Sequence, residues 1–454
     1  MKNRLWIMLI VAVLAIGGIL TAYGTDSSAF GNGKDKNRYS NNGKVKNVIV
    51  LIGDGMGPSF TTAYRYMNDD PSTPKMESTV FDNYFVGNAV TNPEDSEENV
   101  TDSAAAATAM SGAIKTYNGA IAVDNDKKSV RTVLEAAKEK GMATGLVSTS
   151  QVNHATPAAF GTHNESRNNY NEIADDYFDD KLNGQPKVDV LLGGGTDYFK
   201  RDERDLTEEF QKAGYNYVTN KEDLKANDSK NLLGLFAPVG LPKAIDREDS
   251  TPSLEDMTSE ALEQLNKEKD GFFLMVEGSQ IDWAAHANDA VGSMSEMDDL
   301  AKAFETVIEF AKKDKHTQVV LTADHSTGGF SIGRDGDYNM YPEAIKAAER
   351  TPEFMAEEIM NGANAEDVLH QYSTLSFTDE EIASVEEAAE TEDFDNVYSA
   401  ISEVFNKRAG IGFTTGGHTG VDVPVYAYGP KSEVFSGLID NTDIAKNVFK
   451  FINK

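Results

Sequence analysis

Short apolar runs rich in β-branched residues recur along the chain and alternate with longer segments of helical pattern. The runs that predict buried strands lie at 48–52, 144–148, 188–192, 272–276, 319–322 and 425–428. The clearest helical patterns between them cover residues 129–140 and 297–312. Continuous apolar runs are typical of parallel strands covered on both faces, and strands that alternate with helices indicate an α/β fold. The sequence therefore predicts a three-layer α/β sandwich, with a central, mainly parallel β-sheet flanked by helices.

Acidic residues follow three of the predicted strands. Asp54, Glu277 and Asp324 each stand one or two residues beyond the end of an apolar run. In open α/β sheets, ligands bind beyond the carboxyl ends of the strands, so we expect these side chains to converge at one edge. Buried carboxylates repel one another unless a positive group lies between them. The pattern predicts a cation site at this edge.

An aspartate and a histidine follow Glu277 at helical spacing. If a helix begins just after the 272–276 strand, Asp282 and His286 lie on one of its faces, because they are separated by four positions. A carboxylate and an imidazole one turn apart can both bind zinc. The alternative is a solvent-exposed pair on a helix surface, and the position after a buried strand favours the metal site.

Two further histidines stand in glycine-rich turns. His325 directly follows Asp324, although that aspartate could instead serve only to form a turn. His418 lies between glycines in the segment 416–420, where the backbone can approach an ion closely. The chain has seven histidines and no cysteine, so its zinc ligands would have to be histidine and carboxylate. These motifs hold enough of both for two zinc sites.

A serine precedes a run of alanines and is the candidate nucleophile. Ser103 begins the segment 103–109, and an alanine run is a strong helix former whose amino end attracts phosphate. The alternative is that Asp102 or Ser103 only caps the helix. Because no general base adjoins Ser103 in the sequence, its activation would require a metal ion. Arg167 could grip two phosphate oxygens, although a lone arginine is usually a surface charge.

The amino-terminal segment has the pattern of an export signal. Lys2 and Arg4 precede an apolar run over 5–20, and residues 1–24 are therefore interpreted as a signal peptide. An uncleaved membrane anchor is the alternative. Residues 25–44 are predicted to form a flexible leader. We expect an exported protein, whether secreted, periplasmic or at the cell surface, with no membrane contact after cleavage.

The charge balance limits the partners. The chain carries 74 acidic and 42 basic residues, a net charge of −32, which argues against nucleic acid or an anionic membrane surface as a partner. A phosphate substrate would need local positive charge, and bound metal ions with an arginine could supply it. We interpret the acidic excess as a solvated surface that keeps the protein soluble.

The remainder of the chain is predicted as one catalytic domain over residues 45–454. Residues 335–409 are helix-forming, rich in glutamate and alanine, and free of an obvious buried strand, so they are interpreted as a helical insertion. Residues 201–256 are charged and loop-like, and they suggest no chemistry.

Six motifs in a fixed order resemble the alkaline phosphatase family. They are Asp-Gly-Met-Gly at 54–57, Thr-Asp-Ser-Ala at 101–104, Ala-Thr-Pro-Ala at 155–158, Val-Glu-Gly-Ser at 276–279, Asp-His at 324–325 and Gly-His-Thr-Gly at 417–420. The resemblance implies hydrolysis of small phosphate monoesters through a phosphoserine intermediate, at a site with two zinc ions and one magnesium ion. It also implies a crown-like role for the helical insertion and a possible homodimer.

The resemblance assigns a role to each matching residue. One zinc would be held by Asp282, His286 and His418. The second would be held by Asp54, Asp324 and His325. Magnesium would be held by Asp54, Thr156 and Glu277. Ser103 would be the nucleophile and Arg167 the phosphate clamp, with Asp102 beside them.

Two positions depart from the best-known bacterial branch of the family. His154 stands where that branch has an aspartate near magnesium, and Trp283 stands where it has a lysine that reaches phosphate through water. We expect weaker magnesium binding and faster phosphate release. The alternative within enzymes is a related metal-dependent phosphodiesterase or sulfatase-type hydrolase. A non-catalytic metal-binding or adhesion protein is disfavoured, because it would need neither Ser103 nor Arg167.

Overall fold

The computed structural model describes residues 43–453. The predicted signal peptide, 1–24, lies outside the described residues, as does the predicted leader up to residue 42. Among the residues that are described, none of the helices is both long enough and apolar enough to cross a bilayer.

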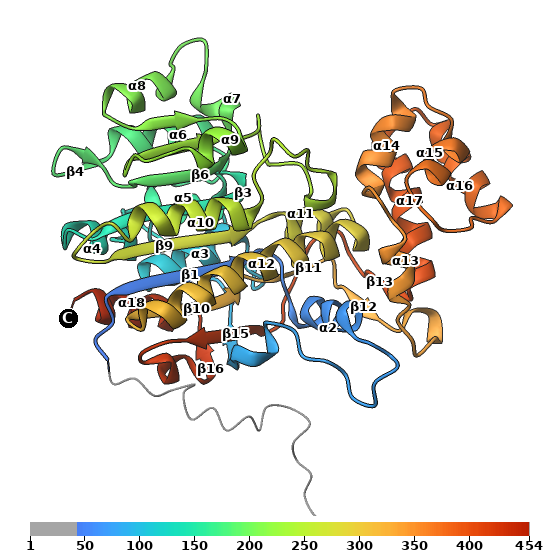
Figure 1. The fold of residues 1–454 in the computed structure, drawn as a ribbon, viewed down its shortest axis with the longest axis horizontal. Coiled ribbons are helices and arrows are strands. Elements are labelled where there is room, and N and C mark those ends of the chain that lie inside the picture. The colour runs from blue at the N-terminus through green and yellow to red at the C-terminus, as the bar shows by residue number, and fades with distance from the viewer. Residues whose placement is uncertain (1–42, 454) are drawn as a thin grey trace, which may run out of the picture.

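A single ten-stranded sheet forms the centre of the molecule, in the order β16-β2-β15-β10-β1-β9-β3-β6-β8-β7 (Figure 1). Only β15 runs antiparallel to its neighbours, so the prediction of a mainly parallel sheet is confirmed. The strands are β1 Asn47–Gly53, β2 Phe85–Val90, β3 Ala143–Gln151, β6 Val190–Gly194, β7 Asn216–Val218, β8 Leu232–Leu235, β9 Phe272–Gly278, β10 Thr317–Ala323, β15 Val423–Tyr428 and β16 Gly437–Asp440.

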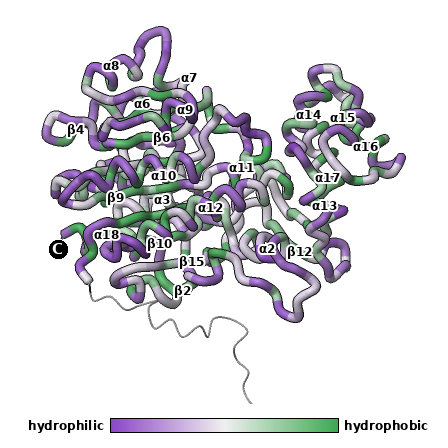
Figure 2. The backbone as a smooth tube through the Cα atoms, in the orientation of Figure 1, coloured by the Kyte–Doolittle hydropathy of each residue, from purple (hydrophilic) through white to green (hydrophobic). Residues whose placement is uncertain are grey.

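Helices cover both faces of this sheet and complete the three predicted layers (Figure 1). One layer contains α2 Pro58–Asn68, α10 Leu254–Leu265, α11 Gln280–His286 and α12 Ala290–Asp314. The other contains α3 Ser103–Gly112, α4 Val133–Glu139, α5 Ala155–Gly161 and α18 Thr442–Ile452. The strands β1, β9 and β10 are buried along their whole length, and Figure 2 shows apolar residues concentrated in the central strands. Burial on both faces explains their continuous apolar runs.

Capping side chains set the ends of the two helices that the sequence predicts. The pattern over 129–140 becomes α4, which begins at Val133 because the Thr132 side chain accepts a hydrogen bond from the amide of Glu135. The pattern over 297–312 becomes α12, which begins earlier, at Ala290, because Asp289 caps it. Caps are local hydrogen bonds that apolar periodicity does not report.

The interpretation of residues 201–256 as loop-like was wrong. This stretch contains the strands β7 and β8 and the helices α8 Leu206–Lys212 and α9 Lys221–Lys225. The strands are only three and four residues long, so the charged residues that connect them obscure their apolar pattern. It also contains the 3-10 helix η2 Ala244–Asp246, and α6 Tyr170–Asp179 and α7 Thr196–Phe199 precede it in the chain.

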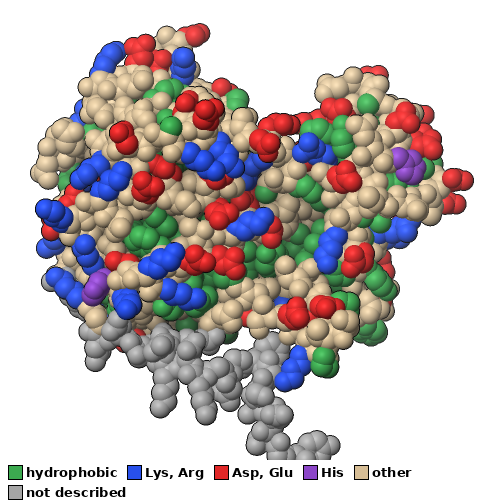
Figure 3. Space-filling view, viewed as in Figure 1, with side chains coloured by type: hydrophobic (Ala, Val, Ile, Leu, Met, Phe, Trp, Pro, Cys, Tyr) green, Lys and Arg blue, Asp and Glu red, His purple; other side chains and the backbone are tan. Residues whose placement is uncertain are grey.

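The segment predicted as a helical insertion, 335–409, contains five helices that stand beside the main body at one end (Figure 1). It consists of α13 Pro342–Lys346, α14 Pro352–Met360, α15 Ala365–Gln371, α16 Asp379–Ala389 and α17 Phe394–Ala409. Acidic side chains gather on its visible surface (Figure 3). Three two-stranded pairs complete the fold, and they join β4 Lys181–Leu182 to β5 Gln185–Pro186, β11 Ser326–Thr327 to β14 His418–Thr419, and β12 Ser331–Ile332 to β13 Ile411–Gly412.

Candidate metal centre

Three adjacent strands bring the predicted acidic residues to one edge of the sheet. β1 lies between β9 and β10, with Ile52 opposite Glu277 and Gly53 opposite Ala323. Asp54 and Asp324 directly follow these strands, so their side chains and that of Glu277 meet, and all three are fully buried. The expected convergence is confirmed.

Most of the carboxylate oxygens at this edge lack a hydrogen-bond donor. Neither oxygen of Asp54 or Glu277 accepts a hydrogen bond, nor does Oδ2 of Asp324, and the buried hydroxyl of Thr156 is also unpaired. Burial, with repulsion from neighbouring carboxylates, raises the pKa of Asp54 well above its usual range, that of Glu277 to about 7 and that of Asp324 to about 6. Unpaired buried carboxylates are costly, and cations among them would remove the cost. The oxygen-rich donor set fits bound metal ions.

The first group of candidate ligands consists of Asp282, His286 and His418. Asp282 and His286 lie on one face of α11, with Oδ2 and Nε2 3.3 Å apart. The Nδ1 atoms of His286 and His418 lie 2.6 and 3.1 Å from the carbonyl oxygens of Gly416 and Thr101. Because a carbonyl can only accept, both Nδ1 atoms carry protons, and the two Nε2 lone pairs then face each other across 3.1 Å. A cation between them is the arrangement that this tautomer favours.

The second group consists of Asp54, Asp324 and His325. The Nε2 atom of His325 lies 3.2 Å from Oδ2 of Asp324 and 3.5 Å from Oδ1 of Asp54. The Thr327 hydroxyl donates its one proton to Oδ1 of Asp282 at 2.5 Å, so it can only accept from Nδ1 of His325, at 3.2 Å. The Nε2 lone pair of His325 is therefore directed to the carboxylates.

Thr327 connects the two groups and was missed by the sequence analysis. It lies on β11 opposite His418 on β14, and its hydroxyl contacts one residue of each group, Asp282 and His325. The rings of His325 and His418 stack with centroids 3.6 Å apart, so the groups form one site. The sequence signal that could have identified Thr327 is its position two residues after His325.

A third group combines Asp54, Glu277 and His154. His154 occupies the position just before α5, whose first turn also carries the unpaired hydroxyl of Thr156. Arg167 donates from Nη2 to Nε2 of His154 at 3.1 Å, which leaves the imidazole proton on Nδ1. Burial and the neighbouring Arg167 lower the pKa of His154 to about 3, so the ring is neutral.

Ser103 begins helix α3 and points at the second group. Its side chain is buried, and its Oγ lies 3.1 Å from Nε2 of His325. The cap of the helix is Asp102, whose side chain accepts a hydrogen bond from the amide of Ala105. Of the two capping possibilities, Asp102 is the correct one, and the Ser103 hydroxyl is left for another role.

Arg167 is fixed next to this serine. Its Nη1 donates to Oδ2 of Asp102 at 2.9 Å, and Nη2 donates to His154. Burial disfavours its charge, but Asp102 keeps the pKa of Arg167 above its ordinary value. The guanidinium therefore remains charged and oriented near Ser103, with N–H groups to spare.

The comparison with known proteins identifies the family to which the chain belongs. Residues 45–454 match the model of the family described as alkaline phosphatase. The chain belongs to the alkaline phosphatase family. It is 62% identical over 416 residues to alkaline phosphatase 3 of Bacillus subtilis (strain 168), which covers 91% of this chain and 90% of that protein. It is 52% identical over 455 residues to alkaline phosphatase 4 of the same strain, covering 100% of this chain and 97% of that protein.

The fold of a solved alkaline phosphatase agrees with this assignment. The cold-active enzyme from a psychrophilic Shewanella species superposes with a TM-score of 0.84 at 41% identity, over 90% of this chain and 100% of that chain. The chain is therefore a phosphomonoester hydrolase of a metal-dependent family, as its motifs predicted.

The ring of Trp283 has room in this alkaline phosphatase because a glycine from a distant segment lies against it. The Trp283 ring lies edge-on to that of His154, with centroids 5.5 Å apart. A Cβ atom at Gly240 would come within 2.5 Å of the Trp283 ring, so only glycine leaves room for it. Gly240 lies in the 201–256 stretch, and no local signal in the sequence indicated its contact with the site.

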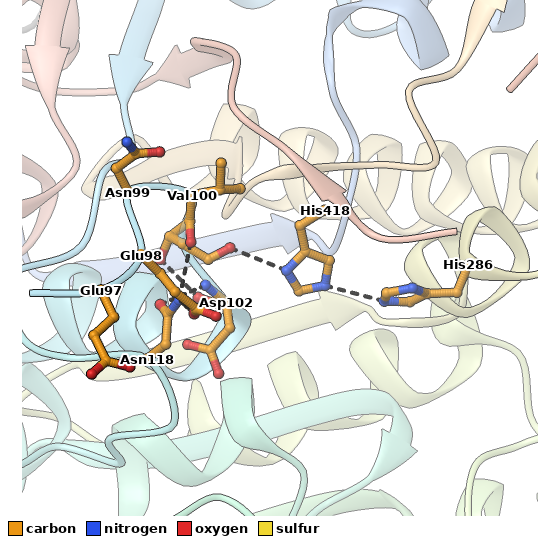
Figure 4. A pocket seen from close by; sticks show the side chains of 9 residues that line it. Glu97, Glu98, Asn99, Val100, Asp102, Asn118, His286 and His418 are labelled. Carbon is orange, nitrogen blue, oxygen red and sulfur yellow. Dashed lines mark hydrogen bonds between the residues drawn. The ribbon is translucent and has the colours of Figure 1, made fainter. Parts of the chain in front are cut away.

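A cavity of about 490 Å³ opens beside the first ligand group (Figure 4). His286 and His418 form one side, and Asn118 and a loop that carries Glu97 and Glu98 form the other. Among the described residues that line it there is no lysine or arginine.

A fourth group of possible ligands does not belong to this site. Glu135, His163 and Asp180 lie close together. The buried ammonium of Lys187 already bonds Glu135 at 2.9 Å and Asp180 at 2.6 Å, and it occupies the position that a metal ion would take.

Proposed function

We propose that this enzyme hydrolyses phosphate monoesters through a phosphoserine intermediate on Ser103, at a site for two zinc ions and one magnesium ion. The observation that supports this most directly is the Ser103 hydroxyl, 3.1 Å from Nε2 of His325 and beside carboxylates without partners. Among the described residues, the base that contacts the Ser103 hydroxyl is the imidazole of His325. We assign that imidazole to the second zinc, so activation of the serine falls to the metal centre.

The ligand sets follow the three groups. The first zinc would be held by Asp282, His286 and His418. The second would be held by Asp54, Asp324 and His325. Magnesium would be held by Asp54, Glu277 and Thr156, with the neutral ring of His154 beside it. When bound, the ions supply the positive charge that attracts phosphate and lowers the pKa of the serine hydroxyl and of water.

The protein contributes orientation and charge. The fixed guanidinium of Arg167 binds nonbridging phosphate oxygens with the donors that Asp102 and His154 leave free. Ser103, at the amino end of α3, places the phosphoryl group at the positive end of the helix dipole. Both effects offset the charge that develops on the phosphoryl oxygens.

The covalent step is tested with Ser103→Ala. We expect most monoesterase activity to be lost while zinc content stays near that of the wild type, because Ser103 is not a ligand. Acid quenching with a radiolabelled monoester should trap label on the wild type only. Label on the alanine variant, or its full activity, would remove the phosphoserine from the mechanism.

The reaction type is tested by comparing matched chromogenic esters. We expect the monoester to be hydrolysed far faster than the diester and the sulfate ester, because the metal centre and Arg167 together suit a dianion. Preference for the diester or the sulfate would instead favour the related phosphodiesterase or sulfatase-type hydrolases.

Export and assembly belong to the same proposal. The sequence of residues 1–24 supports export with signal cleavage, which sequencing the amino terminus of the secreted protein would test. The family resemblance supports a homodimer, which light scattering on the purified protein would test.

A further inference from the structure

The cavity beside His286 and His418 faces the side from which an alcohol would depart. This argument rests on the proposed function. In an in-line displacement at phosphorus, the leaving oxygen lies opposite the attacking oxygen. Ser103 lies against His325 in the second ligand group, whereas the cavity is walled by His286 and His418 of the first. The alcohol of the substrate therefore faces this cavity.

The outer wall of the cavity carries two negative charges without a basic partner. Glu97 and Glu98 are both exposed, and the carboxylate of Glu97 has no hydrogen-bond or ion-pair partner among the described residues. The carboxylate of Glu98 accepts one hydrogen bond, from Nδ2 of Asn118 at 2.6 Å, which is neutral (Figure 4). The negative charge of this wall is therefore available to a ligand.

The wall is fixed relative to the nucleophile. Asp95 accepts hydrogen bonds from the amides of Glu97 and Glu98 through Oδ1, and from the amide of Asn118 through Oδ2. Asn118 in turn accepts the amide proton of Asp102 at 2.9 Å. Because Asp102 caps the helix that begins with Ser103, the same hydrogen bonds position the acidic wall and the attacking hydroxyl.

We infer that this cavity selects phosphate monoesters whose alcohol carries a positive charge, such as esters of amino alcohols and of choline. The phosphate end of such a substrate binds the metal centre, and its ammonium end lies against Glu97 and Glu98. A neutral alcohol gains nothing from these carboxylates, and an anionic alcohol is repelled by them. The acidic wall thus acts as a specificity determinant within a phosphatase of otherwise general chemistry.

The test compares choline phosphate with 3,3-dimethylbutyl phosphate, which has the same shape without the charge, on the zinc- and magnesium-loaded enzyme. One exposed ion pair changes an equilibrium by up to about fivefold, so Glu97 and Glu98 together should raise the ratio of kcat/KM, choline phosphate over dimethylbutyl phosphate, by roughly fivefold at low salt. The ammonium also makes choline the better leaving group, so the two esters differ in intrinsic reactivity and only the change in their ratio is informative. The double variant Glu97→Gln/Glu98→Gln should lower the ratio by this factor. Added salt should do the same to the wild type.

A matched control separates the wall from the overall charge of the protein. Glu222→Gln/Glu263→Gln removes two exposed carboxylates from α9 and α10, away from the cavity, and should leave the ratio unchanged. An unchanged ratio in Glu97→Gln/Glu98→Gln, or an equal fall in both double variants, would overturn the inference. Absence of turnover with either ester, and with a chromogenic monoester, would instead refute the proposed function.

Discussion

Removal of the Thr327 hydroxyl is the sharpest test of how the two ligand groups are coupled. In Thr327→Val the side chain keeps its shape, but Oδ1 of Asp282 loses a donor at 2.5 Å and Nδ1 of His325 loses an acceptor at 3.2 Å. The imidazole is then free to adopt the other tautomer, with a proton on Nε2 where a metal ion requires a lone pair.

The magnitude follows from the kind of bond that is lost. A hydrogen bond to a charged group contributes about 1.5–3 kcal/mol, which corresponds to roughly 10- to 150-fold in an equilibrium constant. We therefore expect zinc affinity to fall by about 10- to 100-fold, the range typical of residues that orient metal ligands. Competition with a chromogenic chelator measures the affinity, and monoester turnover at saturating zinc measures the remaining activity.

Thr327→Ser is the matched control, because it keeps the hydroxyl and removes only a methyl group. Serine should retain zinc affinity within a few fold of the wild type. If valine binds zinc as tightly as threonine, or if serine and valine lose affinity equally, the tautomer argument is wrong.

Three further outcomes follow from the site. In metal-free protein the raised pKa values of Glu277, about 7, and Asp324, about 6, mean that the folded state holds protons that the unfolded state releases. The contribution of these two groups to stability is therefore fully present near pH 4 and is lost as pH rises through 6 to 7, and metal-loaded protein should not show this loss. Melting temperatures against pH, before and after chelation, check both. His154→Asp adds a carboxylate to the third group and should tighten magnesium binding by about tenfold, measured by magnesium titration of activity, and an unchanged midpoint would contradict the role of this position. Gly240→Ala brings a Cβ within 2.5 Å of the Trp283 ring and 2.7 Å of Nε2 of Gln280, and it should destabilise the fold by about 1–3 kcal/mol in urea unfolding. The same substitution should cost less in a Trp283→Ala background, and an equal cost in both backgrounds would exclude the ring contact as the main cause.

Much of the site could be predicted because its ligands follow strands in the sequence. Parallel strands end at the same edge of a sheet. Residues that directly follow such strands, such as Asp54 and Asp324, can therefore be predicted to lie close together although they are far apart in the sequence. The spacing of Asp282 and His286 is equally informative, because one helical turn places both on one face. The family resemblance adds an expected role for each residue.

Apolar patterns in the sequence missed the start of one helix and two short strands. Residue periodicity predicted α12 but placed its start at residue 297 instead of Ala290. The true start is set by the cap of Asp289, where the apolar spacing is weak. The strands β7 and β8 were missed because runs of three and four residues are too short for a period to show.

The amino-acid sequence by itself determined the α/β class, the set of carboxylates and imidazoles, and the serine that stands at the start of a helix. Tertiary structure alone decided which nitrogen of each imidazole faces the metal centre, since Nδ1 of His418 is held by the carbonyl of Thr101, more than 300 positions away. It likewise decided that the hydroxyl of Thr327 bridges two ligand groups, and that Glu97 and Glu98 line a cavity beside His286 and His418. Composition and spacing specify which groups are present, whereas hydrogen bonds between distant segments fix protons and directions, and these exist only once the chain has folded.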